Sequence, residues 1–234
     1  MSSTDRDIRV FANNEERTGA VREYILSCIH EALDARNVCS IALSGGTTPL
    51  SLYASLSNAT LDWSRIHVFL VDERFVSTDS ADSNEKMIRQ TLISNITIPT
   101  ENFHLLYTTG TLENMAYEAS HDIQAFFGNK PSFDIILLGM GDDGHTASLF
   151  EIPNMHNTHT IVVPIHNSPK PPSERLSLSY TTINNAAHII FLVSGSSKSV
   201  PFHSVQNNDT TLPATHIRPL NGDMVWFIDK EVAV

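Results

Sequence analysis

The sequence predicts an α/β fold in which a mostly parallel sheet forms the middle of a single three-layer αβα domain spanning residues 1–234. Segments with the composition of strands alternate along the chain with segments of helical periodicity, as in proteins built from βαβ units. Several strand segments are apolar throughout, which is typical of strands buried on both faces of a parallel sheet. No internal repeat and no low-complexity linker divides the chain.

The expected strands are short segments rich in β-branched and aliphatic residues. In chain order they cover residues 8–11, 39–43, 66–71, 103–106, 135–138, 160–165, 175–179, 188–193 and 224–228. The run at 135–138, Ile-Ile-Leu-Leu, has the length of a strand buried on both faces. The segment 175–179 alternates between polar and apolar side chains, which indicates an edge strand.

The expected helices carry apolar residues at spacings of three and four, so that each has one apolar face. They cover residues 15–36, 50–56, 82–93, 112–127 and 181–187. Thr48 is a natural N-cap for the second of these helices, and Pro49 fits its first helical position. Residues 146–150 are expected to form the first turn or two of a further helix.

Composition restricts the class of partner. Hydrophobic residues make up 41% of the chain and charged residues 18%, a balance that allows a sizeable core. The net charge of −11 argues against binding to nucleic acid or to an anionic membrane surface. Cys28 and Cys39 give no disulfide framework and fit a reducing compartment. The sequence has no visible signal peptide and no run of 18 apolar residues, so we expect a cytoplasmic protein. We also expect a monomer.

Polar segments follow four of the expected strands, at residues 44–48, 72–74, 139–145 and 194–198. The carboxyl ends of parallel strands meet at one edge of a sheet, so these segments should lie together. They supply a Ser/Gly/Thr loop, an arginine, a histidine two residues from an aspartate, and a lysine. Arg74 alone would more simply be a surface ion pair with Glu73 or a neighbour, and Lys198 alone a solvated charge, but the set is suited to a small phosphorylated ligand.

Two other types of site are disfavoured. Residues 139–144 match the dinucleotide pattern G-x-G-x-x-G, but Asp142 and Asp143 would repel a pyrophosphate, and no acidic residue lies about 20 positions further on. Residues 44–49 lack the lysine of a nucleotide-binding P-loop. His156 and His159 form an isolated H-x-x-H pattern in a loop, and we expect no metal site there.

Six motifs, in this order, resemble those of the 6-phosphogluconolactonases. They are SGGTTP (44–49), VDER (71–74), DSN (82–84), GMGDDGHTASLF (139–150), NSPKPPSERLSL (167–178) and VSGSSK (193–198). The resemblance covers about residues 40 to 200, and residues 212–229 are similar to the C-terminal segment of that family. The family shares a wider fold with glucosamine-6-phosphate deaminases and ribose-5-phosphate isomerases.

The resemblance implies hydrolysis of 6-phospho-glucono-1,5-lactone to 6-phosphogluconate in the oxidative pentose phosphate pathway. It implies a phosphorylated sugar lactone as the small-molecule partner, no organic cofactor and no required metal. His145 matches the general base of the family, with Asp143 beside it. The positions that match those lining the substrate or phosphate site are Ser44, Gly45, Gly46, Thr47, Arg74, Arg175 and Lys198.

Three positions depart from the family pattern. Asp142 and Glu151 stand where proline is usual, and Ala81 stands where histidine is frequent. These changes are expected to affect rate and substrate range more than reaction type.

Two alternative functions remain open. The first is a glucosamine-6-phosphate deaminase or isomerase, but deaminases typically have tyrosine in place of Arg74 and a Phe-Asn-Glu-Pro segment after the DGH loop. The second is a non-catalytic sugar-phosphate-binding module, but the related regulators carry a DNA-binding segment, whereas this chain is acidic and starts almost directly with a strand.

Overall fold

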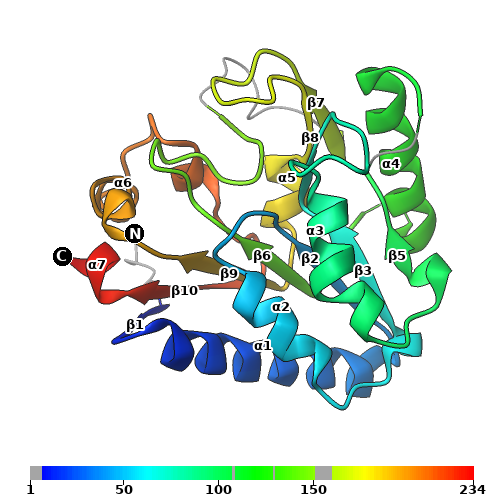
Figure 1. Cartoon of the computed structure of the whole chain (residues 1–234), viewed down its shortest axis with the longest axis horizontal. Helices are drawn as coiled ribbons and strands as arrows, with labels where there is room; N and C mark the ends of the chain where they lie inside the picture. The colour runs from blue at the N-terminus through cyan, green and yellow to red at the C-terminus, as the bar shows by residue number, and fades with distance from the viewer. Residues whose placement is uncertain (1–6, 107–108, 129, 151–159) are drawn as a thin grey trace.

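A seven-stranded parallel sheet forms the middle layer of the molecule, in the strand order β1-β10-β9-β6-β2-β3-β5 (Figure 1). The computed structural model describes residues 7–106, 109–128, 130–150 and 160–234. The strands are β1 (Asp7–Phe11), β2 (Cys39–Leu43), β3 (Ile66–Leu70), β5 (Phe103–His104), β6 (Ile135–Leu138), β9 (His188–Val193) and β10 (Asp223–Asp229). The predicted α/β class and the mostly parallel sheet are confirmed.

Helices cover the sheet on both sides (Figure 1). They are α1 (Asn14–Arg36), α2 (Leu50–Ser57), α3 (Asn84–Thr91), α4 (Leu112–Phe127), α5 (Tyr180–Asn184), α6 (Ser199–Gln206) and α7 (Lys230–Ala233). The 3-10 turns are η1 (Trp63–Arg65), η2 (Ile93–Asn95), η3 (Thr100–Asn102), η5 (Ser196–Lys198) and η6 (Pro213–His216). Every residue of β2 and β6 is buried, as their apolar composition requires.

A second, antiparallel sheet of three strands lies beside the carboxyl end of β3. Its order is β4 (Asp72–Arg74), β8 (Arg175–Leu178), β7 (Val162–Ile165). Two sequence predictions are wrong here, because residues 72–74 form a strand and β8 is the central strand of this sheet. The alternation in β8 suggested an exposed face, but its polar residues Arg175 and Ser177 are buried and hydrogen-bonded.

The strand order reverses between β2 and β6. From β2 the chain passes to β3 and β5 on one side, while β6, β9 and β10 build the sheet on the other side. At such a reversal the connections leave the sheet in opposite directions and open a crevice at the carboxyl ends of the strands. The segments after β2, β6 and β9 therefore lie around one hollow.

Two local predictions beside this hollow are also wrong. Helix α2 has Pro49 as its N-cap, with no side-chain cap bond, so Thr48 does not cap it. Residues 146–150 form no helix, since Thr146 and Leu149 make an isolated β-bridge and Ala147 has a positive φ of 52°. The Thr146 hydroxyl donates to the carbonyl of Gly139 at 2.8 Å, which folds the segment back on the end of β6.

A buried carboxylate ties β4 to α3. Glu73 accepts hydrogen bonds from the backbone N–H groups of Arg74 (2.7 Å), Asn84 (2.8 Å) and Glu85 (2.7 Å), and from the Ser83 hydroxyl (3.2 Å). Burial raises the pKa of Glu73, although these backbone bonds act in the opposite direction. An acid at a helix N-terminus is also favoured by the helix dipole. Glu73 therefore fixes the start of α3 against the strand that carries Arg74.

We expect Glu73→Ala to lower the free energy of unfolding by about 3 kcal/mol or more, because buried N–H donors lose a charged acceptor. Urea denaturation of the variant against wild type measures this. Glu101→Ala, which removes an exposed carboxylate, serves as the control. A midpoint for Glu73→Ala equal to that of the control contradicts the assignment.

Candidate active site

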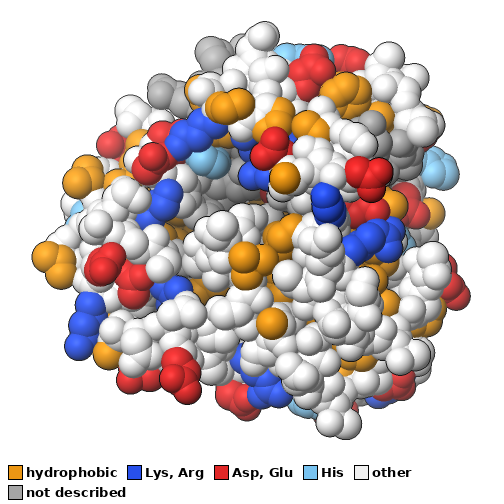
Figure 2. Space-filling model, in the orientation of Figure 1, with side chains coloured by type: hydrophobic (Ala, Val, Ile, Leu, Met, Phe, Trp, Pro, Cys, Tyr) orange, Lys and Arg blue, Asp and Glu red, His pale blue; other side chains and the backbone are white. Residues whose placement is uncertain are grey.

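The hollow at the strand reversal is a cleft of about 360 Å³. Figure 2 shows the surface hollowed there, with acidic and basic side chains around the rim. Its walls come from the segments that follow β2, β6 and β9, from β4 and the first residue of α3, and from Lys170 before β8 and Arg175 at the start of β8. All the substrate-binding positions predicted from the sequence line it: Ser44, Gly45, Gly46, Thr47, Arg74, Arg175 and Lys198.

The loop after β2 forms one wall of the cleft. The Ser44 hydroxyl donates to the carbonyl of Leu137 on β6 at 2.7 Å, and the Tyr53 hydroxyl donates to the carbonyl of Ser44 at 2.6 Å. A Cβ at Gly45 would lie 1.8 Å from Oδ1 of Asn84, so only glycine fits there. Gly46 has a φ of +96°, which L side chains rarely adopt. The Gly-Gly pair thus allows the backbone to turn tightly against α3.

His145 and Asp143 form a hydrogen-bonded pair, with 2.5 Å between Nδ1 of His145 and Oδ1 of Asp143. The His145 ring packs on Phe150 with 4.5 Å between ring centroids. A Cβ at Gly141 would lie 2.1 Å from Nδ1 of His145, so this glycine makes room for the ring. The tautomer that donates from Nδ1 to the carboxylate leaves Nε2 as a basic nitrogen. His145 lines the cleft, whereas Asp143 is not among the lining residues.

Burial lowers the pKa of His145 below its ordinary value, and the carboxylate of Asp143 partly opposes this effect. Burial raises the pKa of Asp143, but the hydrogen bond from His145 and its charge outweigh burial, so the net shift is downward. At neutral pH the pair therefore consists of a neutral imidazole and an ionised carboxylate. This is the protonation state that a general base requires.

The cations of the cleft are held in different ways. Arg175 is buried, and its guanidinium donates to the carbonyls of Lys170 (3.2 Å), Pro171 (3.1 Å) and Pro172 (3.0 Å). Arg175 therefore organises the loop before β8. Because its N–H groups donate to these carbonyls, it contributes positive charge to the cleft more than hydrogen-bond donors. The Arg74 guanidinium donates to the carbonyl of Asp82 at 2.7 Å.

Lys198 ends the 3-10 turn η5 and is half-buried at the cleft. Burial lowers its pKa. Among the cations of the cleft, Lys198 is the one that lies in the turn that follows β9.

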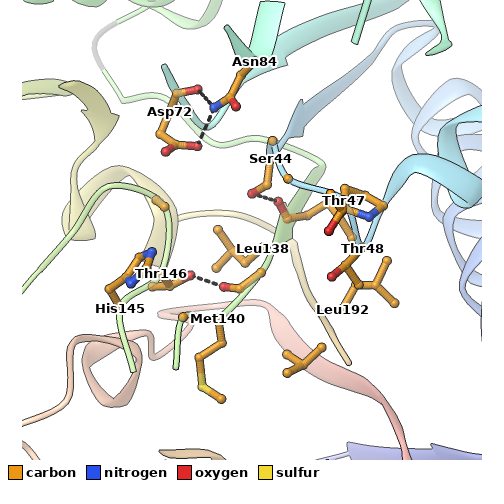
Figure 3. Close-up of a pocket in the computed structure, with 18 of the residues that line it drawn as sticks. Ser44, Thr47, Thr48, Asp72, Asn84, Leu138, Met140, His145, Thr146 and Leu192 are labelled. Atoms are coloured by element: carbon orange, nitrogen blue, oxygen red, sulfur yellow. Dashed lines mark hydrogen bonds between the residues drawn. The ribbon is translucent and has the colours of Figure 1, made fainter. Parts of the chain in front are cut away.

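Several cleft residues were not assigned individually as substrate-binding positions from the sequence, although some of them lie in the polar segments expected at this edge of the sheet. They are Thr48, Asp72, Asn84, Met140, Thr146, Lys170 and Ser194. Asp72 accepts from the Ser148 hydroxyl at 2.6 Å and from Nδ2 of Asn84 at 3.3 Å, the latter contact being drawn in Figure 3. Asp72, Asn84 and Lys170 belong to the motifs VDER, DSN and NSPKPP. Those motifs indicated the family, and each of these residues could have been predicted to line the cleft from its motif.

Lys170 interacts with both acids of the glycine loop. It forms an ion pair with Asp142, and its Nζ lies 3.6 Å from Oδ2 of Asp143. Asp142, at a position where the family resemblance led us to expect proline, thus pairs with a lysine that lines the cleft.

Among the described residues, no group of three or more His, Cys, Asp and Glu side chains is placed to hold a metal ion. His156, His159 and Glu151 lie outside the described residues. Within the part of the chain that the structure covers, no helix has both the length and the apolar character needed to cross a membrane.

The fold and the cleft together define an α/β protein that gathers a basic histidine and several cations at the strand reversal of a parallel sheet. A family model described as glucosamine-6-phosphate isomerases/6-phosphogluconolactonase matches residues 12–226. The chain belongs to this family.

Relatives of known name agree with this assignment. A 6-phosphogluconolactonase of Synechocystis sp. is 37% identical over 211 residues, which cover 87% of each chain. One of Mycobacterium leprae is 33% identical over 241 residues, covering 97% of this chain and 96% of the relative.

Solved structures show the same architecture. The 6-phosphogluconolactonase of Thermotoga maritima superposes with a TM-score of 0.89 at 31% identity, covering 97% of this chain and all of the other. A monomeric glucosamine-6-phosphate deaminase superposes with a TM-score of 0.82 over 97% of this chain and 98% of its own. At 20% identity, the deaminase demonstrates the shared fold alone.

We expect His145 to titrate with a midpoint below about 6.5, because burial disfavours the imidazolium. Asp143→Asn removes the charge that stabilises the imidazolium and should move the midpoint further down. Proton–nitrogen NMR of the His145 ring against pH measures both midpoints. Asp34→Asn, an exposed change on α1, is the control. An upward shift in Asp143→Asn contradicts the pairing.

Proposed function

We propose that this protein hydrolyses 6-phospho-D-glucono-1,5-lactone to 6-phospho-D-gluconate in the oxidative pentose phosphate pathway, and that it does so as a cytoplasmic monomer. The observation that carries the proposal is the hydrogen bond between His145 and Asp143, because His145 lines a cleft that also contains several cations. The names of the relatives support the same reaction.

In the proposed mechanism, neutral His145 takes a proton through Nε2 from a water molecule that attacks C1 of the lactone. Asp143 holds the ring and stabilises the imidazolium that forms. Backbone N–H groups of the glycine-rich loops stabilise the oxyanion of the tetrahedral intermediate. The bond between C1 and the ring oxygen then breaks, and the imidazolium returns its proton to that oxygen, which becomes the C5 hydroxyl.

The residues of the cleft suit a substrate with one reacting end and one charged end. Figure 3 places His145 on one side and Thr47 and Thr48 on the opposite side. With C1 at His145, the phosphate on C6 would reach toward the loop after β2. Lys198, which lies close enough to Asp142 and Asp143 to interact with their charges, is the second candidate ligand. Backbone N–H groups in a tight glycine turn and a lysine are both suitable phosphate ligands.

A second candidate, a deaminase or isomerase, has less support. Arg74 lines the cleft at the position where the deaminases typically carry tyrosine. A non-catalytic sugar-phosphate-binding module would bind 6-phosphogluconate without turnover. A coupled assay with freshly generated lactone, corrected for spontaneous hydrolysis, distinguishes all three functions. No rate above background from folded protein rejects the lactonase proposal.

We expect His145→Ala to reduce the catalysed rate by about 10²–10⁴-fold, the usual contribution of general acid–base catalysis. The fold should persist, because the side chain lies at the cleft and not in the core. The same coupled assay measures the loss, with His30→Ala, an exposed change on α1, as the control. A rate for His145→Ala near that of the control removes His145 from the mechanism.

We expect Lys198→Ala to lower kcat/KM for the phosphorylated lactone by about 10- to 150-fold, since a hydrogen bond to a charged group contributes about 1.5–3 kcal/mol. Unphosphorylated gluconolactone should be affected far less. Kinetics on both lactones measure the difference, with the exposed Lys230→Ala as the control. Equal losses on the two substrates would show that Lys198 does not bind the phosphate.

A further inference from the structure

An arginine with no part in the proposed chemistry is buried next to the cleft. Arg17 lies in the first turn of α1 and is only 2% exposed. Its NH1 donates to the carbonyl of Val193, the last residue of β9, at 3.1 Å. The same nitrogen donates to Oδ2 of Asp229 at 3.1 Å, and NH2 donates to Oδ1 of Asn14 at 2.8 Å.

Asp229, the partner of Arg17, holds the turn that leads to Lys198. Its Oδ2 also accepts from the Ser194 hydroxyl at 2.6 Å and from the backbone N–H of Gly195 at 3.0 Å. Gly195 has a φ of +94°, and the 3-10 turn η5 (Ser196–Lys198) starts at the next residue. The path of the chain from the end of β9 to Lys198 therefore depends on contacts made by Asp229.

Arg17 is also connected to the other phosphate-binding candidate, the loop after β2. Nδ2 of Asn14 donates to Oγ of Ser51 at 3.3 Å, and Oγ of Ser51 lies 3.0 Å from the hydroxyl of Thr18. Ser51 lies in the first turn of α2, directly after this loop. A second hollow of about 430 Å³ joins these parts, and its lining includes Asn14, Arg17, Thr47, Thr48, Ser51 and Ser194.

Stability alone does not account for a charged pair in this place. Burying an arginine and an aspartate costs desolvation free energy that their attraction often fails to recover. Burial lowers the pKa of Arg17, while Asp229 acts in the opposite direction. Within the described residues, Nε of Arg17 has no hydrogen-bond partner. What the pair supplies is fixed geometry, since one guanidinium joins α1 to the ends of β9 and β10.

We propose that the pair formed by buried Arg17 and half-buried Asp229 is a positioning element that aligns the 194–198 turn with the loop after β2, so that both contact the same phosphate group. The inference rests on the proposed function and extends it. Arg17 acts through its neighbours, because it is buried and both of its terminal nitrogens are occupied.

The test compares Arg17→Met with wild type on phosphorylated and unphosphorylated gluconolactone. Misalignment of a binding group by about 1 Å can cost up to about 100-fold, and we expect a loss of that order in kcat/KM for the phosphorylated lactone. The loss should lie mainly in KM, and the unphosphorylated lactone should react at close to the wild-type rate. Asp229→Asn should show the same selectivity. Arg22→Met, a change on the same helix at a residue that contacts Glu23 and the carbonyl of Ser55 but neither Asp229 nor Val193, should behave as wild type.

Equal loss on both substrates, or no difference between Arg17→Met and Arg22→Met, overturns the inference. If Arg17→Met does not fold, Arg17→Lys decides, because a single ammonium cannot serve acceptors on α1, β9 and β10 together. It should show the same selective loss at smaller size, and a uniform loss or none overturns the inference.

Failure of the proposed function gives a different result, because the wild-type protein itself would then have no lactonase activity. In that case calorimetry compares the binding of 6-phosphogluconate with that of gluconate. A preference for 6-phosphogluconate that Arg17→Met abolishes upholds the positioning role. A wild-type protein with no such preference rejects both proposals.

Discussion

The pairing of β2 with β6 is the constraint on which the cleft depends. The two strands are parallel neighbours, with Ile41 opposite Ile135, although the chain passes through β3 and β5 between them. Asp134 secures this junction, because its Oδ2 accepts from the backbone N–H and the hydroxyl of Ser40, both at 2.8 Å. A reversal of strand order at this pair opens the crevice and brings the segments after β2, β6 and β9 together. A change in this pairing would separate His145 from the loop after β2.

The cleft contains several cations, whereas the molecule as a whole is negatively charged. The chain carries −11, and a substrate phosphate carries about −1.5 to −2 near neutral pH. Binding therefore requires local cations held where water is scarce, since their attraction is stronger there than at the open surface. Backbone carbonyls hold Arg175, and two aspartates hold Lys170. These contacts keep the cations in place without an anion bound.

Much of the fold was predictable because its elements are locally encoded. Residues 39–43, 135–138 and 188–193 form strands with the predicted bounds, and 112–127 forms the predicted helix. In each of these segments a mainly apolar run or a helical period is enough to identify the element from the local sequence. The predictions that failed concern segments whose conformation depends on distant partners. Strand β8 lies between β4 and β7, and residues 146–150 fold back on the end of β6.

The sequence by itself determined the class of fold, and it indicated the strand ends at which the cleft lies and the candidate side chains His145, Asp143 and Lys198. These follow from short patterns whose physical basis is local periodicity and turn chemistry. Only the tertiary structure decided that Arg175 supports a loop, that Lys170 pairs with Asp142, and that Arg17 holds Asp229. Arg17 and Asp229 are 212 positions apart, and no local pattern relates them. Such contacts are set by the packing of complete elements, which is why the folded chain alone reveals them.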